Sequence, residues 1–195
     1  MFNKKSPKII DIIDTKIQLL RKIKKDKTLV TKINDTIKII YNGINNHGKL
    51  MIIGNGGSAA DSQHMAAELV GKYLKLRKPI PAISMSTDTS ILTSISNDMS
   101  FNNIFTRQFE ALKKKNDILL AITTSGKSKN IIHTLKLAKK NKIKSVCLTS
   151  IKAPKELEKI CDVVIRVPAS RVDRIQELHL FIEHFICEEL ENIIK

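Results

Sequence analysis

Apolar residues near the start of the chain recur at every third or fourth position, in two successive sets. The first set comprises Ile9, Ile13, Ile17, Leu20 and Ile23, and the second comprises Ile33, Ile37, Ile40 and Ile44. This spacing places each set on one face of an α-helix. Turn-forming residues at 45–48 separate the second helix from the next apolar run. The pattern predicts two amphipathic helices, which we assign to an N-terminal helical arm over residues 1–48.

Five short, largely β-branched apolar runs come after the arm. They span residues 50–53, 81–86, 117–124, 145–149 and 163–167. Each ends in a polar loop and leads into a helix-like segment, the last of which, residues 172–193, has a broad apolar face. Strands that alternate with helices are typical of a parallel sheet with right-handed crossovers. We therefore predict an α/β domain over residues 49–195, with a five-stranded parallel sheet flanked by helices.

The composition limits the classes of partner. The chain has 195 residues, which suits one domain with an appended arm. Its net charge of +15 comes mainly from lysines spread along the whole sequence rather than clustered in one segment. Aromatic residues make up only 4%, with no Trp, which disfavours binding of single-stranded nucleic acid by base stacking. We attribute the charge to a compositional bias and expect no nucleic-acid partner.

The apolar runs and the cysteines indicate the compartment. Charged residues interrupt every apolar run near the N-terminus, so the sequence predicts neither a signal peptide nor a membrane-spanning helix. Cys147, Cys161 and Cys187 are odd in number, widely spaced and set among apolar residues. This usage is typical of free thiols in a reducing compartment. We expect a cytoplasmic protein with no membrane partner.

Two polar loops that come directly after predicted strands have the composition of phosphate-binding loops. Residues 54–58, Gly-Asn-Gly-Gly-Ser, combine glycines, which let backbone N–H groups approach an anion, with a serine that can cap the next helix. Residues 123–128, Thr-Thr-Ser-Gly-Lys-Ser, bring four hydroxyl groups to the start of another helix. Ligands of parallel sheets bind at this end of the strands. Neutral donors beside a helix dipole suit a phosphate monoester.

Both loops also resemble nucleotide-binding motifs, but each departs from the pattern. Residues 54–59 fit the G-x-G-x-x-[GA] fingerprint, yet no acidic residue ends a second strand about 20 residues further on. In the second loop Ala121 stands where a P-loop requires its first glycine. The sequence therefore favours a phosphate monoester over a nucleotide. Strand-to-helix turns that hold no ligand are the remaining alternative.

Two helices carry residues able to ligate a divalent ion. His64 and Glu68 stand four apart on the helix after the first loop, so they share one face. Gln176 and His184 stand eight apart on the final helix, about 12 Å along its axis. Imidazole, carboxylate and amide oxygen are all ligands of zinc-like ions. A single His–Glu pair is usually a surface ion pair, but this one comes after a loop with phosphate-binding chemistry.

Several of these segments together resemble a known family. They are GNGGSAAD at 54–61 with Gln63 and His64, SND at 96–98, TSGKS at 124–128 and DRIQE at 173–177. In this order and spacing they are similar to the phosphoheptose isomerase branch of the sugar-isomerase (SIS) family, from roughly residue 30 to the end. The resemblance implies the SIS fold and a sugar-phosphate ligand. It also implies isomerisation of sedoheptulose 7-phosphate to D-glycero-D-manno-heptose 7-phosphate, for the heptose of lipopolysaccharide or related glycans.

The resemblance also implies roles for individual residues. It places substrate contacts at Asn55, Gly56, Gly57, Glu68, Asn97, Asp98, Thr123, Thr124, Ser125, Ser128 and Gln176. It places one Zn²⁺ per active site on His64, Glu68, Gln176 and His184. For proton transfer between C1 and C2 through an enediol, Glu68 is the candidate base and His184 the candidate acid. Lys127 departs from the family pattern, in which Asn is common at this position.

Two alternatives concern the function and the final helix. A non-catalytic branch of the SIS family binds the bacterial replication initiator, and by resemblance it lacks the acidic residue at position 68 and the histidine at position 184. This chain has both, which favours the enzyme. His179 lies only three residues from Gln176 and competes with His184 as a ligand, but the resemblance selects His184 and we expect His179 to be a packing residue.

The apolar faces of the two N-terminal helices predict that the protein is an oligomer. These two helices offer more apolar surface than one small sheet is expected to cover, so we expect them to pack against other subunits. The resemblance implies a homotetramer with active sites at subunit boundaries. Because Gln176 and His184 are about 12 Å apart along one helix, we also predict that the His64–Glu68 pair and at least one of these two residues come from different protomers.

Overall fold

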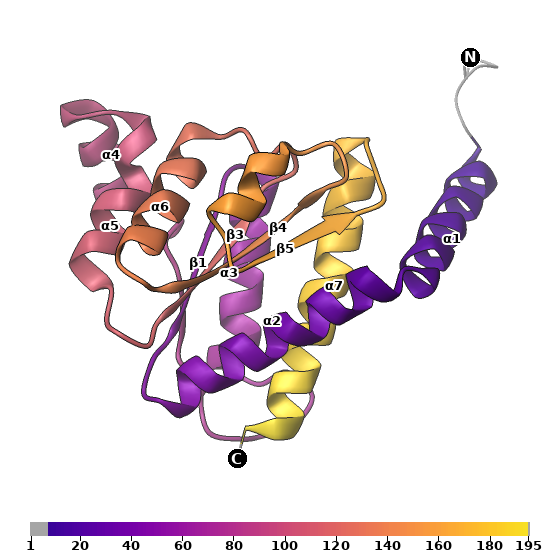
Figure 1. Ribbon diagram of the computed structural model, residues 1–195, viewed down its shortest axis with the longest axis horizontal. Helices are drawn as coiled ribbons and strands as arrows, with labels where there is room; N and C mark the ends of the chain where they lie inside the picture. The colour runs from indigo at the N-terminus through magenta and orange to yellow at the C-terminus, as the bar shows by residue number, and fades with distance from the viewer. Residues whose placement is uncertain (1–7, 195) are drawn as a thin grey trace.

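The computed structural model describes residues 8–194 as one α/β fold (Figure 1). In chain order the elements are α1 (Ile9–Lys25), α2 (Lys27–Asn45), β1 (Leu50–Gly54), α3 (Gly57–Val70), β2 (Ala82–Ser84), α4 (Thr89–Asp98), η1 (Phe101–Asn103), α5 (Ile104–Leu112), β3 (Ile118–Ile122), α6 (Lys129–Lys140), β4 (Lys144–Ser150), η2 (Lys155–Lys159), β5 (Val163–Val167) and α7 (Val172–Ile193). Both predicted N-terminal helices and the predicted final helix are present. The strands fall within or beside the five predicted runs.

The sheet has the strand order β2-β1-β3-β4-β5, and every neighbouring pair is parallel. The predicted five-stranded parallel sheet flanked by helices is therefore confirmed. β1 and β3 lie side by side at its centre, with Gly54 opposite Ile122 at their carboxyl ends. The two loops predicted to hold a phosphate leave the sheet at these neighbouring ends.

Alternate strand residues enter two separate cores because the sheet is covered on both faces. Leu50 and Ile52 belong to a cluster that includes apolar residues of α2, α3 and α7. Met51 and Ile53 belong to a second cluster, which includes residues of α5 and α6. The first core joins α3 to α7, and this packing positions the candidate active site.

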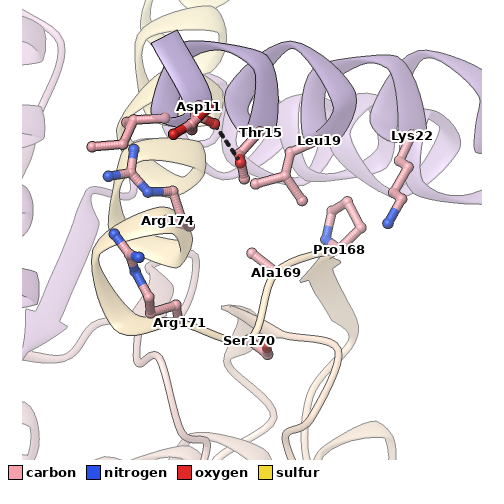
Figure 2. A pocket seen from close by; sticks show the side chains of 10 residues that line it. Asp11, Thr15, Leu19, Lys22, Pro168, Ala169, Ser170, Arg171 and Arg174 are labelled. Atoms are coloured by element: carbon pink, nitrogen blue, oxygen red, sulfur yellow. Dashed lines mark hydrogen bonds between the residues drawn. The ribbon is translucent and has the colours of Figure 1, made fainter. Parts of the chain in front are cut away.

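The N-terminal helices differ in their packing. α2 buries Leu29, Ile33, Ile37 and Ile40 in the first core. α1 projects beyond the sheet (Figure 1) and leaves Ile9 and Ile10 66% and 60% exposed. A cavity of about 330 Å³ separates α1 from the turn before α7, with Arg171 and Arg174 on its far wall (Figure 2). The division of the chain at residue 48 stays a prediction.

The three cysteines are free thiols, as predicted. Cys147 and Cys187 are buried, and Cys161 is half-buried. Burial in the α7 core raises the pKa of the Cys187 thiol to about 12, which keeps it protonated and unreactive. Within residues 8–194 no helix has the length and apolar character needed to cross a membrane.

Candidate active site

The loop between β1 and α3 turns sharply on glycines. Gly56 precedes α3 with φ of +56°, a conformation that favours glycine over other residues. A Cβ atom on Gly57 would lie 2.0 Å from Nε2 of Gln176, so the amide of that α7 side chain rests directly against the start of α3. The N–H groups of Ser58 and Ala59 donate to the backbone carbonyls of Asn55 and Gly56, each at 3.0 Å, so at the start of α3 it is the backbone N–H of Gly57 that stands beside this side-chain amide.

The loop between β3 and α6 is held by its own hydroxyl groups. Gly126 has φ of +64° and donates its N–H to Oγ1 of Thr123 at 3.2 Å. Lys127 donates its N–H to Oγ of Ser125 at 3.2 Å. Ser128 occupies the N-cap of α6, but its side chain makes no capping hydrogen bond with the described residues. The loop is thus preformed, with the Ser128 hydroxyl available to a ligand.

The two loops enclose a cavity of about 230 Å³. It is lined by Asn55, Gly57, Ser58, Ile122, Thr123, Thr124, Ser125, Ser128, Val172 and Gln176. Most of the predicted substrate-binding residues are in this set. α3 and α6 both begin at the cavity, so the partial positive charge at the N-termini of two helices stabilises an anion bound there.

Asn55 is held by a residue that sequence reasoning missed. Its side-chain amide donates to Oδ1 of Asn130 at 2.9 Å and accepts from Nδ2 of the same residue at 3.0 Å. Asn130 lies on α6 and is 2% exposed. A reciprocal amide pair therefore joins the first loop to the helix that begins at the second.

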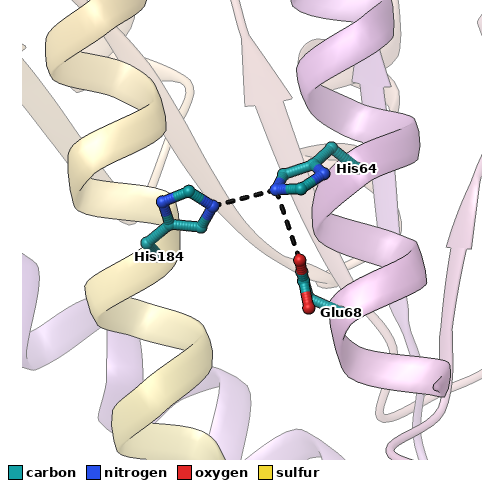
Figure 3. Close-up of side chains that lie close together, drawn as sticks. All are labelled: His64, Glu68 and His184. Carbon is teal, nitrogen blue, oxygen red and sulfur yellow. Dashed lines mark hydrogen bonds and ion pairs between the residues drawn. The ribbon is translucent and has the colours of Figure 1, made fainter. Parts of the chain in front are cut away.

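His64, Glu68 and His184 form a compact group between α3 and α7 (Figure 3). The Nε2 atoms of the two histidines are 2.8 Å apart, and Oε1 of Glu68 is 3.4 Å from Nε2 of His64. One ligand atom from each residue lies within 4.8 Å of the others. The side chain of Glu68 is 21% exposed and that of His64 44% exposed, so the group is open to a substrate.

This donor set fits a zinc ion. In a tetrahedral site with bonds of about 2.0–2.1 Å, neighbouring ligand atoms lie about 3.3 Å apart. Two of the three spacings, 2.8 and 3.4 Å, lie on either side of this value, and all three are within 4.8 Å. Two imidazole nitrogens and a carboxylate oxygen are also the ligands typical of catalytic zinc, which leaves a further coordination position open.

A segment after α3 supports the group from one side. Tyr73 stacks on the ring of His184, with centroids 5.9 Å apart and an interplanar angle of 25°. Beside Tyr73, the backbone N–H groups of Leu74 and Lys75 donate to the carboxylate of Glu191. Arg77 pairs with Glu191 at 3.2 Å and donates to backbone carbonyl groups at the end of α3. The stacking contact fixes the plane of a candidate ligand ring.

The prediction that at least one of Gln176 and His184 comes from a different protomer than the His64–Glu68 pair is contradicted for His184. His184 meets His64 within one chain, and Gln176 lies against Gly57 of the same chain. The physical reason is that α3 and α7 lie side by side in the first core, so residues two turns apart on α7 contact different turns of α3. Gln176 lines the cavity, and its assignment as a zinc ligand stays a prediction.

Asn97 and Asp98 lie apart from this cavity. They end α4 and are joined by a hydrogen bond of 2.8 Å between their side chains. Asp98 lines a different cavity of about 410 Å³, together with Met99 and Arg107. Their role in substrate binding stays a prediction.

Titratable groups are also buried behind the His64–Glu68–His184 group. His179 is fully buried, as expected of a packing residue, and burial lowers its pKa to about 4. Burial raises the pKa of Glu183 to about 8, and the charge of Asp61 adds to the shift. Arg174 forms an ion pair with Glu177 at 2.6 Å.

Comparisons with known proteins show the family to which this chain belongs. A model of the SIS domain matches residues 13–150. The curated phosphoheptose isomerase of Aliarcobacter butzleri (strain RM4018) is 42% identical over 166 residues, which cover 85% of this chain and 87% of the relative. This chain belongs to the phosphoheptose isomerase family of SIS-domain proteins.

Solved structures of the phosphoheptose isomerase family share the whole fold. Phosphoheptose isomerase GmhA from Neisseria gonorrhoeae superposes with a TM-score of 0.87 at 33% identity, covering 95% of this chain and 97% of the other. A phosphoheptose isomerase from Francisella tularensis gives a TM-score of 0.86 at 32% identity, with 94% and 96% coverage. The resemblance on which the sequence analysis rested is therefore confirmed.

Proposed function

We propose that this chain isomerises sedoheptulose 7-phosphate to D-glycero-D-manno-heptose 7-phosphate. The observation that carries the proposal is the layout of α3, which begins at the anion cavity and presents Glu68 to the His64–His184 pair. Gly57 and His64 are seven residues apart, or about 10 Å along the helix. A ketose with its carbonyl at C2 and its phosphate at C7 needs two such separated subsites.

The cavity residues bind the phosphate end. The backbone N–H groups of Gly57 at the start of α3 and of Lys129 at the start of α6 supply donors, and the hydroxyl of Ser128 adds another. These groups are neutral and already in place, so binding fixes the substrate without reorganising the loops. The reacting end then extends toward Glu68 and His184.

Glu68 and His184 move the protons. Glu68 removes the proton from C1 of the ketose, and the resulting enediol is reprotonated at C2 to give the aldose. His184 exchanges a proton with the adjoining oxygen atoms, so that the carbonyl group passes from C2 to C1. Both side chains approach the same point from different helices, which allows one substrate to contact both.

We propose one Zn²⁺ per active site, held by His64, Glu68 and His184, with Gln176 as the fourth ligand that the family resemblance implies. The ion would polarise the carbonyl group and stabilise negative charge on the adjoining oxygens. A carboxylate bound to a cation is a weaker base, because the cation favours its charged form.

The rival function, non-catalytic binding of a replication initiator, has no support. The resemblance distinguishes that branch by the lack of an acidic residue at position 68 and of the final histidine. Both are present here and lie in one group. The curated relatives are named phosphoheptose isomerases instead.

We also propose a homotetramer in which α1 packs against a neighbour, supported by the exposed isoleucines of α1. Asn97 and Asp98 would then reach the cavity of a neighbouring subunit, since they lie apart from that of their own chain. A cytoplasmic location is supported by three free thiols. The product would supply heptose for lipopolysaccharide or a related glycan.

The direct test is turnover of sedoheptulose 7-phosphate by the purified chain. We expect the heptose 7-phosphate to form, and Glu68→Gln to lower kcat by on the order of 10²- to 10⁴-fold. Glu110→Gln is the matched control, because this exposed glutamate of α5 lies outside the cavity and should leave turnover unchanged. Absence of turnover in the wild type, together with tight binding of a replication initiator, would establish the rival function.

A further inference from the structure

The amide of Asn130 has its orientation set by the helix that carries it. α6 begins at Lys129, so the N–H of Ile131 lies in the first turn and has no partner within the helix. This N–H donates to Oδ1 of Asn130 at 2.9 Å. The side-chain oxygen must therefore face the helix backbone, which leaves Nδ2 on the opposite side of the amide.

The orientation of the Asn130 amide determines that of Asn55, which lies 75 residues away in the sequence. The oxygen of Asn130 also accepts from Nδ2 of Asn55 at 2.9 Å, and Nδ2 of Asn130 donates to Oδ1 of Asn55 at 3.0 Å. Rotating the Asn55 amide by half a turn would place its Nδ2 against Nδ2 of Asn130 and its Oδ1 against Oδ1 of Asn130, and both hydrogen bonds would be lost. Asn55 is therefore held in one of its two amide orientations.

This arrangement leaves Asn55 with one free N–H and one free lone pair. Asn55 lines the anion cavity, whereas Asn130 is 2% exposed and is not among the lining residues. Asn130 can act on a ligand only through its partner. It also ties the Gly54–Ser58 loop to α6, so that the two sides of the cavity keep a fixed separation.

We propose that Asn130 is a positioning residue of the isomerase, which orients the Asn55 amide for the sugar phosphate through their reciprocal hydrogen bonds. The inference rests on the proposed function, because it takes Asn55 as a substrate contact. It assigns a role to a buried residue outside the cavity. A purely structural role, by contrast, would affect folding without affecting substrate binding.

The test is a double-mutant cycle on Asn55→Ala and Asn130→Ala, with kcat and KM measured for sedoheptulose 7-phosphate. We expect Asn130→Ala alone to lower kcat/KM by on the order of 10- to 100-fold, mainly through KM. In the Asn55→Ala background the same change should have almost no further effect. Losses that multiply in the double variant, or an unchanged KM in Asn130→Ala, would overturn the proposal.

A matched control and a partial restoration separate positioning from stability. Thr134 is also buried on α6, and its hydroxyl donates to the backbone carbonyl of Asn130 at 2.8 Å. Thr134→Val should therefore lower the melting temperature while leaving KM unchanged. In Asn130→Asp the new carboxyl can donate to Asn55 only when protonated, so kcat/KM relative to wild type should rise as the pH falls. A pH-independent ratio would contradict positioning.

Substrate binding is measured as well as turnover, so that a failure of the proposed reaction can be distinguished from a failure of the positioning role of Asn130. Sedoheptulose 7-phosphate should raise the melting temperature of the wild type and of Thr134→Val, and raise it less in Asn130→Ala. If the wild type binds the sugar phosphate without turning it over, the reaction is wrong and the binding data alone decide on Asn130. An equal rise in all three proteins would overturn the positioning role.

Discussion

The Nε2 atoms of His64 and His184 lie 2.8 Å apart, although 120 residues separate them in the sequence. Each comes from a helix of the first core, and Glu68 completes the group from the α3 side. The contact brings together the donor atoms of a candidate metal site. This contact, the packing of α1 and the burial of His179 each have measurable consequences.

Metal content is the first prediction. Elemental analysis of the purified protein should find about one zinc ion per chain, given a site of this composition. His64→Ala and His184→Ala should each remove the metal, because two protein ligands of the group then remain. His133→Ala is the matched control, since His133 lies on α6 outside the group, and it should keep its zinc. Full activity after chelation, with no metal detected, would return Glu68 and His184 to acid–base roles alone.

Complementation between inactive chains is the second prediction. Glu68 and His184 meet within one chain, so co-expressed Glu68→Ala and His184→Ala should form mixed oligomers as inactive as their parents. Asp98→Ala co-expressed with Glu68→Ala should instead recover part of the activity, because we propose that Asp98 serves a neighbouring subunit. Activity in the first mixture, or its absence in the second, would contradict this assignment of residues to subunits.

The exposed face of α1 gives the third prediction. Ile13 and Ile17 are 46% and 41% exposed in the single chain, and burying them against a neighbour would favour assembly. Ile13→Glu should shift the protein from tetramer to smaller species in analytical ultracentrifugation. Lys24→Glu changes an exposed polar position of the same helix and should leave the tetramer intact. A wild-type monomer would contradict the proposed assembly.

His179 gives the fourth prediction, on stability against pH. Burial holds its folded-state pKa at about 4, below the usual 6.5. Between these values the unfolded chain binds a proton that the folded chain does not, so the contribution of His179 to the free energy of unfolding falls as pH falls, by about 3 kcal/mol at pH 4.

His179→Leu removes this contribution, and the difference in free energy of unfolding between variant and wild type should change across pH 6.5 to 4. Glu183, whose pKa is raised to about 8, is present in both proteins, so the comparison subtracts the contribution that the two proteins share. Chemical denaturation of both proteins at several pH values measures this difference in the free energy of unfolding. Parallel stability profiles would show that folding does not lower the pKa of His179.

Local sequence patterns predicted most of the fold. The run from Leu50 to Ile53 is apolar throughout because it is buried on both faces of the sheet, and its abrupt change to glycines marks the loop. Helical spacing likewise located α7 from Val172 to Ile193. These features depend on residues that are close together in the sequence, so the pattern of apolar and polar positions is enough to predict them.

Contacts between distant segments were not predictable in the same way. The separation of about 12 Å between Gln176 and His184 along one helix suggested two protomers, since the sequence does not show that α3 runs alongside α7. Asn130 and Tyr73 were missed for a similar reason. Each acts on a partner far away in the sequence, Asn55 and His184 respectively, and leaves no periodic signal of its own.

We propose that Glu68 transfers a proton between C1 and C2 of sedoheptulose 7-phosphate, and running the reaction in D₂O tests this transfer directly. An enediol route exchanges the transferred proton with solvent, so mass spectrometry and NMR should find deuterium at C2 of the heptose 7-phosphate. Glu68→Gln should slow deuterium incorporation by the same factor as turnover. Product formed by the wild type with no deuterium at C2, or undiminished incorporation in Glu68→Gln, would contradict the account.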